Sequence, residues 1–189
     1  LSTEAVFGVL FSVLLLGEQM TPRMLAGCGL LFLAVLLSET KLSFLGKVFE
    51  RFFPDSRTDS AYKIDYESLY REGYRGLIFD IDNTLVPHGE PPDARAVQLF
   101  ERLHAIGFSS CLLSNNKLER VASFHRPVGG HFIENAHKPS TANYIRAMEL
   151  MGTDRENTLF IGDQLFTDIY GAKRAKIRNI LVDPIHPKE

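Results

Sequence analysis

The feature that most constrains the fold is an alternation, in the second half of the chain, between short apolar runs and helix-like segments. The apolar runs predict buried strands at residues 76–81, 108–113, 131–133, 158–161 and 179–182. Helical spacing or helix-end signals mark the segments between them, at 93–106, 118–124, 140–151 and 167–175. Strands that alternate with helices predict an α/β fold with a Rossmann-like parallel sheet covered by helices on both faces.

Polar side chains gather at the carboxyl ends of the predicted strands, which is where open α/β sheets bind their ligands. In chain order they are Asp80, Asp82 and Thr84, then Ser114, Asn115 and Asn116, then His137 and Lys138, and finally Asp163 and Asp168. Each alone has an ordinary explanation as a turn, a helix cap or a solvated surface residue. Their placement at successive strand ends predicts that they converge on one site.

Two carboxylates two residues apart at a strand end can reach one substrate in different roles. Asp80 would attack phosphorus, and Asp82 would donate a proton to the leaving oxygen and later take one from the hydrolytic water. Asp163, together with Asp80 and the backbone carbonyl of Asp82, would bind a hard cation, and such oxygen ligands suit Mg²⁺ better than zinc. The sequence thus predicts a Mg²⁺-dependent phosphatase.

Other residues are expected to support this chemistry. Ser114 and Asn115 would hydrogen-bond the phosphoryl group, and Lys138 would neutralise its charge in the transition state. Asp168 and Thr84 are expected around these ligands, Asp168 to orient Lys138 or a metal-bound water.

The same segments resemble the four motifs of the haloacid dehalogenase superfamily: "DIDNT" (80–84), "LLSNN" (112–116), "HKPS" (137–140) and "IGDQLFTD" (161–168). Within it, "GLIFDIDNTLVP" and "GDQLFTDIYGAKR" are most similar to the YqeG family of subclass IIIA phosphatases, whose relatives include phosphatidylglycerophosphate phosphatases. The resemblance covers roughly residue 49 to the end and implies the roles given above. It also implies that the family pattern runs on beyond Glu189.

The first 40 residues differ chemically from the rest, since they contain only four charged residues. Apolar runs at 5–17 and 24–38 flank a turn that contains Thr21, Pro22 and Arg23, which predicts a helical hairpin. Each run is shorter than the roughly 20 residues that span a bilayer, so a soluble core hairpin is an alternative. The lack of a polar stripe and the presence of small residues favour a transmembrane hairpin.

Residues 1–43 also resemble the last two transmembrane helices of EamA-type drug/metabolite transporters, notably "LLLGEQMTPRMLAGCGLLFLAVLLSE". This implies a gene fusion or a piece of a longer protein, and the non-Met residue Leu1 fits a fragment or a processed end. The predicted organisation is a hairpin at 1–40, a linker with a lead-in helix at 41–61 and a phosphatase domain at 62–189. Basic residues after the second apolar run predict, by the positive-inside rule, that the phosphatase domain lies in the cytoplasm and is attached to the membrane. If the hairpin is a fusion artefact, the phosphatase domain would be cytoplasmic without this attachment.

The intervals between the polar motifs leave no room for a cap domain, which predicts an open site for a large or membrane-embedded substrate. A lipid phosphate fits this site and the hairpin, and the resemblance points to phosphatidylglycerophosphate. Alternatives are soluble sugar or nucleotide phosphates, a transporter-derived membrane fragment with a passenger phosphatase domain, or a binding module without turnover. A net charge of −2 makes nucleic acid an unexpected partner. The two cysteines show no zinc or disulfide pattern. The sequence leaves the oligomeric state open.

Overall fold

The computed structural model describes residues 29–30, 33 and 50–185 of the chain. The chain divides into two units, Leu1–Glu50 and Arg51–Glu189. The predicted hairpin, with its resemblance to EamA transporters, lies outside the described residues except for Gly29, Leu30 and Leu33, which are helical. Within the described ranges, no helix combines the length and apolar character needed to cross a membrane.

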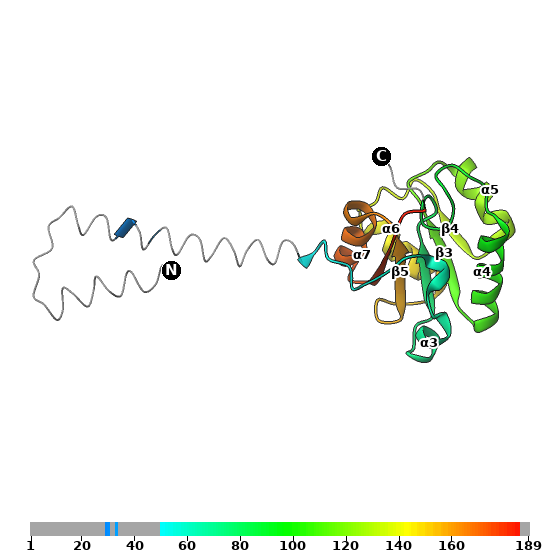
Figure 1. Ribbon diagram of the computed structural model, residues 1–189, viewed down its shortest axis with the longest axis horizontal. Coiled ribbons are helices and arrows are strands. Elements are labelled where there is room, and N and C mark those ends of the chain that lie inside the picture. The colour runs from blue at the N-terminus through cyan, green and yellow to red at the C-terminus, as the bar shows by residue number, and fades with distance from the viewer. Residues whose placement is uncertain (1–28, 31–32, 34–49, 186–189) are drawn as a thin grey trace, which may run out of the picture. The chain divides into compact units, whose positions relative to one another are not determined.

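A parallel sheet of six strands forms the centre of the second unit, in the order β1-β6-β5-β2-β3-β4 (Figure 1). The strands are β1 (Ser56–Thr58), β2 (Gly76–Phe79), β3 (Ser109–Leu113), β4 (His131–Ile133), β5 (Thr158–Gly162) and β6 (Arg178–Val182). The predicted α/β class with a Rossmann-like parallel sheet is therefore confirmed.

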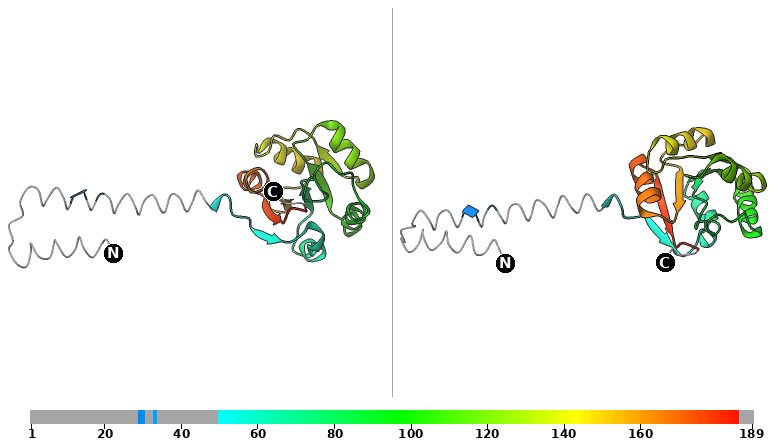
Figure 2. Two further views of the ribbon diagram at one scale, coloured as in Figure 1. Left: turned by 45° about the horizontal axis from the view of Figure 1, so that its top comes forward. Right: turned by 90° about the horizontal axis from the view of Figure 1, so that it is seen from above.

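Helices cover both faces of this sheet (Figures 1 and 2). They are α3 (Tyr66–Arg71), α4 (Ala94–Ile106) and α5 (Leu118–Val128) on one face, and α6 (Ala142–Met151) and α7 (Tyr170–Ala175) on the other. Successive side chains of a strand point to opposite faces, so Leu77 and Phe79 of β2 join the apolar cluster with Phe100 of α4. Ile78 between them joins the cluster with Tyr144 of α6. The central strands are thus buried on both sides, as their continuous apolar runs predict.

The segment expected to be a linker with a lead-in helix, 41–61, instead contributes the edge strand β1. Ser56 pairs with Ile180 of β6, and the carboxylate of Asp55 accepts hydrogen bonds from the backbone N–H (3.0 Å) and side-chain amide (2.8 Å) of Asn179. The three residues of β1 contain no apolar run, so the sequence does not indicate a strand there. Pairing with the distant strand β6 is what makes them a strand. The wider division into domains stays a prediction.

Two predicted helix starts are also wrong. The helix expected at 140–151 is α6, which begins instead at Ala142 after Thr141, with no capping hydrogen bond from a side chain. The helix expected at 167–175 is a π-helical turn, η2 (Leu165–Ile169), followed by α7. The backbone N–H of Gln164 donates to Oδ2 of Asp168 (3.2 Å), which ties this acidic side chain to the start of the turn. Such single π turns are rare and are frequently found at functional sites.

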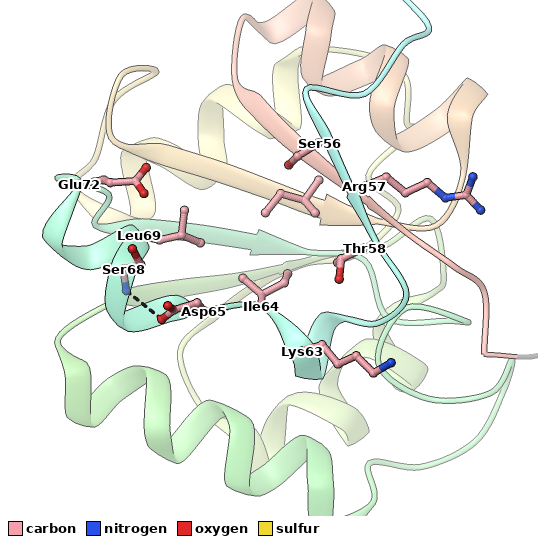
Figure 3. Close-up of a pocket in the computed structure, with 10 residues that line it drawn as sticks. Ser56, Arg57, Thr58, Lys63, Ile64, Asp65, Ser68, Leu69 and Glu72 are labelled. Carbon is pink, nitrogen blue, oxygen red and sulfur yellow. Dashed lines mark hydrogen bonds between the residues drawn. The ribbon is translucent and has the colours of Figure 1, made fainter.

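A shallow pocket of about 370 Å³ lies beside β1, between that strand and α3 (Figure 3). Its lining includes Arg57, Lys63, Asp65 and Glu72, and Asp65 caps α3 by accepting the N–H of Ser68 at 3.0 Å. None of the polar residues predicted to converge at the strand ends lines this pocket, so it is separate from the candidate site.

Candidate active site

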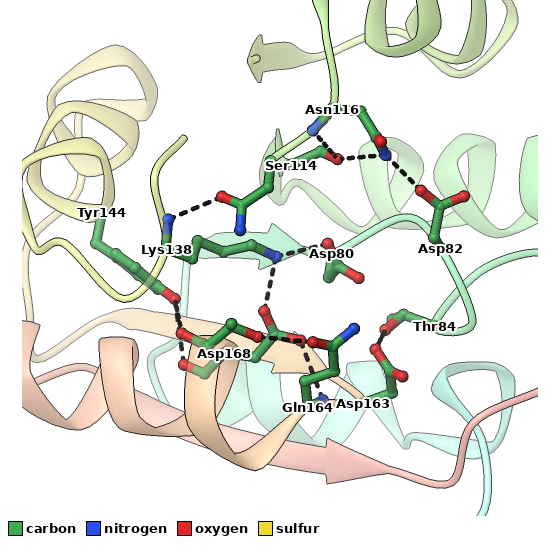
Figure 4. A network of polar contacts seen from close by, with 12 residues as sticks. Asp80, Asp82, Thr84, Ser114, Asn116, Lys138, Tyr144, Asp163, Gln164 and Asp168 are labelled. Atoms are coloured by element: carbon green, nitrogen blue, oxygen red, sulfur yellow. Dashed lines mark hydrogen bonds and ion pairs between the residues drawn. The ribbon is translucent and has the colours of Figure 1, made fainter. Parts of the chain in front are cut away.

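A buried ammonium group lies at the centre of the predicted constellation (Figure 4). Lys138, which follows β4, donates from Nζ to Oδ1 of Asp80 and to Oδ1 of Asp168, each at 2.6 Å. Asp80 directly follows β2, and Asp168 comes from η2 after β5. The side chains of the three residues are 3%, 8% and 1% exposed. The parallel sheet therefore brings together residues that are far apart in sequence, as the strand-end pattern predicts.

Burial and crowding of negative charge shape the titration of these groups. Burial raises the pKa of Asp80; the ammonium of Lys138 opposes this effect and the carboxylate of Asp168 adds to it. Burial likewise raises the pKa of Asp163 to about 6, with a further contribution from Asp168. Burial alone would lower the pKa of Lys138, but the carboxylates of Asp168 and Asp80 outweigh it and raise that pKa. Lys138 therefore stays charged, and one ammonium faces three carboxylates.

These three carboxylates form a group that could hold a metal ion. One oxygen each from Asp80, Asp163 and Asp168 lies within 4.8 Å of the others. A set of hard oxygen donors suits a hard divalent cation, whose charge would balance the excess left by the single ammonium. Asp80 and Asp163 were expected as metal ligands, whereas Asp168 was expected to orient Lys138 or a metal-bound water. The structure places Asp168 against Lys138 and also within the acidic group.

Thr84 and the turn around it support the acidic group. The hydroxyl of Thr84 donates to Oδ1 of Asp163 at 3.3 Å, in the surrounding position expected for it. Asn83 has a left-handed φ of 63°, a conformation that Asn adopts more readily than most residues, and its N–H closes the turn by donating to the carbonyl of Val86 at 2.7 Å. Thr84 therefore contacts Asp163 on the side of the acidic group, within a turn that Asn83 allows to be tight.

The carboxylate of Asp82 points away from Lys138 and faces a second set of donors (Figure 4). It accepts hydrogen bonds from the N–H of Gly89 (2.9 Å), from Nη2 of Arg120 (3.0 Å) and from Nδ2 of Asn116. Burial would raise the pKa of Asp82, but these hydrogen bonds outweigh it and hold that pKa below its usual range. The two acids of the "DID" motif therefore have different surroundings: burial raises the pKa of Asp80, whereas these donors favour the ionised form of Asp82.

The loop after β3 organises both sides of the site. The hydroxyl oxygen of Ser114, which is buried, accepts from the N–H (3.2 Å) and the side-chain amide (3.1 Å) of Asn116. Oδ1 of Asn115 accepts the backbone N–H of Lys138 at 2.8 Å, so Asn115 positions the loop that carries the ammonium. Their expected contacts with a phosphoryl group stay predictions.

Arg120 is the residue of this site that sequence reasoning missed. It lies in the first turn of α5, three residues after Lys117, the residue that precedes this helix. A helix that follows a strand begins at the edge of the parallel sheet where the carboxyl ends of the strands lie and ligands bind. A basic residue in the first turn of such a helix is therefore a candidate site residue that the sequence could have indicated. Cys111, in contrast, is a buried core residue, and burial raises the pKa of its thiol to about 12.

Gly162, at the end of β5, gives the site its close packing. A Cβ atom at this position would lie 2.5 Å from Oδ2 of Asp168 and 2.8 Å from Cε1 of Phe160. Both distances are shorter than any normal contact, so the carboxylate of Asp168 occupies the space that a side chain would need.

Comparison with known proteins identifies a family. Residues 135–184 match the family described as HAD-hydrolase-like. "Probable phosphatase YqeG" of Bacillus subtilis (strain 168) is 36% identical over 135 residues, which are 71% of this chain and 78% of that protein. "Phosphatidylglycerophosphate phosphatase 1, chloroplastic/mitochondrial" of Arabidopsis thaliana is 24% identical over 136 residues, and the match covers 67% of this chain and 39% of that longer protein.

A solved structure of a hypothetical protein from Xanthomonas campestris shares the fold, with a TM-score of 0.51, 16% identity and coverage of 69% of this chain and 76% of that one. This likeness shows the architecture alone. The match to YqeG, which covers most of both chains, agrees with the four motifs and with the way the sheet assembles them. The chain therefore belongs to the haloacid dehalogenase-like hydrolases, as a phosphatase of the YqeG family.

Proposed function

We propose that this phosphatase hydrolyses phosphomonoesters with Mg²⁺ through an aspartyl-phosphate on Asp80, and that its substrate is a lipid phosphate such as phosphatidylglycerophosphate. The observation that carries the proposal is the juxtaposition of Asp80 with a buried ammonium and two further carboxylates. A nucleophilic carboxylate needs positive charge beside it to approach a phosphate dianion, and this arrangement supplies one cation and a place for another.

The residues divide the reaction into two steps. A carboxylate oxygen of Asp80 forms a bond to phosphorus while the bond from phosphorus to the ester oxygen breaks, and Asp82 gives that oxygen its proton. Asp82 then takes a proton from water, whose oxygen attacks phosphorus and releases phosphate from Asp80. Lys138 holds positive charge against the phosphoryl oxygens in both steps. Bound Mg²⁺, held by Asp80, Asp163 and the carbonyl of Asp82 with Asp168 nearby, would supply charge neutralisation.

Exposed apolar side chains beside the site support a lipid substrate. Phe166 is 73% exposed and Leu165 is 40% exposed; both belong to η2, the turn that also carries Asp168. The ring of Phe52 lies 5.5 Å from that of Phe166, and Phe53 is 64% exposed. Aromatic side chains of this kind are well suited to the interface between membrane and water.

The sequence before Phe52 supports the same assignment. The apolar runs at 5–17 and 24–38 are compatible with a membrane hairpin that holds the catalytic domain at a bilayer. A lipid phosphate would then be presented at the surface to which the domain is attached. The Arabidopsis relative is named for phosphatidylglycerophosphate, which is a lipid phosphomonoester of this class.

A substrate panel tests the proposal directly. The full chain in detergent, given Mg²⁺, is expected to release phosphate from phosphatidylglycerophosphate faster than from sugar or nucleotide monophosphates, and a chelator is expected to abolish release from all of them. Phosphate release measured with added Mg²⁺, with Ca²⁺ and with chelator provides the readout. Rapid hydrolysis of a soluble ester while the lipid stays intact would favour the soluble alternative, and activity that survives the chelator would exclude the metal.

The variant Phe166→Ser tests whether the exposed aromatic side chain contacts lipid. On vesicles that contain phosphatidylglycerophosphate, kcat/KM is expected to fall roughly 10- to 150-fold, because burying a Phe side chain is worth about 1.5–3 kcal/mol. Turnover of a soluble phosphomonoester should change much less. Leu150→Ser is the matched control, since Leu150 is 41% exposed on α6, and equal losses in the two variants would contradict a specific lipid contact.

A further inference from the structure

The leaving group of the substrate has to lie beside Asp82, since Asp82 protonates the ester oxygen in the proposed function. The side chains around Asp82 therefore line the leaving-group side, away from the ammonium of Lys138. Asn116 and Arg120 both contact the Asp82 carboxylate, and the ring of His88 approaches it at 3.9 Å. This side is rich in hydrogen-bond donors.

A pocket of about 640 Å³ opens from the same place. It is lined by Asn115, Asn116, Lys117, Glu119, Arg120 and Ser123. Two of these side chains, Lys117 and Arg120, are cationic and one, Glu119, is anionic, and Arg120 lies directly beside the carboxylate of Asp82. An anion that extends from the leaving group would meet this surface.

Arg120 has unused capacity to bind such an anion. Its Nη2 atom donates to Asp82 and to the backbone carbonyl of Glu90 (2.6 Å). Its Nε atom is buried and has no hydrogen-bond partner among the described residues, and the side chain is 20% exposed. A buried donor without a partner is costly unless a ligand satisfies it, and arginine is a favoured residue for binding phosphate groups.

From this geometry we propose that Arg120 forms a second anion subsite that binds a phosphodiester in the leaving group of the substrate. The preferred substrates are then phosphomonoesters that carry a further phosphate anion beyond the alcohol being released. This inference rests on the proposed function and makes the head group, in addition to the acyl chains, a determinant of specificity.

Two water-soluble substrates separate the head group from the membrane. Glycerol 3-phosphate has the scissile ester alone, whereas glycerophosphoglycerophosphate, the deacylated head group of phosphatidylglycerophosphate, has the same ester plus a phosphodiester. The wild-type chain is expected to favour the second in kcat/KM. In Arg120→Ala this preference should fall roughly 10- to 100-fold, as expected for lost charged hydrogen bonds, and Arg120→Lys should retain part of it.

The ratio of kcat/KM for glycerophosphoglycerophosphate to kcat/KM for glycerol 3-phosphate shows whether Arg120 binds the phosphodiester or only positions Asp82. A loss that is equal for both substrates would mean that Arg120 only positions Asp82, and it would overturn the subsite. Arg126→Ala is the matched control, since Arg126 is exposed on the same helix and should leave the ratio unchanged. Added guanidinium is expected to restore part of the lost preference of Arg120→Ala.

A binding measurement keeps the subsite testable if neither compound is hydrolysed, a result that would count against the proposed function. Calorimetry with Asp80→Asn should show tighter binding of glycerophosphoglycerophosphate than of glycerol 3-phosphate, and the double variant with Arg120→Ala should lose the difference. Equal binding of both compounds to Asp80→Asn would overturn the subsite.

Discussion

Asp80→Asn is expected to lower kcat by roughly 10⁵-fold or more, as the loss of a covalent nucleophile does in other hydrolases. The amide has nearly the same shape as the carboxylate but cannot attack phosphorus, and the proposed aspartyl-phosphate cannot form. Hydrolysis of a phosphomonoester in Mg²⁺ measures the loss. Acid-quenched protein incubated with a ³²P-labelled substrate should retain label in the wild type and none in the variant.

The control for this prediction is Asp59→Asn, because Asp59 is an exposed carboxylate paired with Lys63 at 2.7 Å outside the site. It should have wild-type turnover. Circular dichroism should show that Asp80→Asn is folded. Turnover close to wild type in a folded Asp80→Asn would remove Asp80 from its role, whatever the substrate.

Lys138→Met is expected to damage both activity and stability. Removal of the ammonium leaves Asp80 and Asp168 without the partner that each contacts at 2.6 Å, and breaking a buried ion pair on one side costs about 3–5 kcal/mol. Loss of the charge that faces the phosphoryl group should lower kcat by roughly 10³- to 10⁵-fold, the range known for cations that stabilise phosphoryl transfer. Denaturant unfolding without metal and hydrolysis with Mg²⁺ measure the two effects.

The matched control is Lys173→Met, which breaks the partly exposed ion pair between Lys173 and Asp55, whose side chains are 26% and 31% exposed. Partly exposed pairs contribute little, so the loss there should be about 1 kcal/mol or less. A second variant, Lys138→Met with Asp168→Asn, should recover part of the stability lost in Lys138→Met, since it removes one of the uncompensated carboxylates. Equal unfolding free energies for Lys138→Met and wild type would contradict the buried triad.

Sequence reasoning reached the sheet and the main site because both follow from local patterns. Continuous apolar runs such as 76–79 predict buried parallel strands, and the rule that ligands bind beyond their carboxyl ends places Asp80, Lys138 and Asp168 together without knowledge of any contact. The resemblance to the haloacid dehalogenase superfamily, carried by the same motifs, agrees with the match to YqeG.

What sequence reasoning missed depends on contacts between distant segments. Strand β1 has no pattern of its own, and its three residues become a strand through pairing with β6. Asp168 lies in a π turn that the helical pattern of its segment does not indicate, and its carboxylate accepts a hydrogen bond from the backbone N–H of Gln164. Arg120 contacts Asp82 and the carbonyl of Glu90 because α5 approaches the turn after β2. Its position in the first turn of that helix indicates the right edge of the sheet, but not these contacts.

The tight fit at Gly162 has a consequence for how substitutions here should be interpreted. A methyl group at this position would collide with the Asp168 carboxylate. A change from glycine to alanine therefore displaces the carboxylate that accepts a hydrogen bond from Lys138. A substitution at Gly162 would thus have the same kind of effect as a substitution of Asp168 or Lys138, although glycine itself has no side chain.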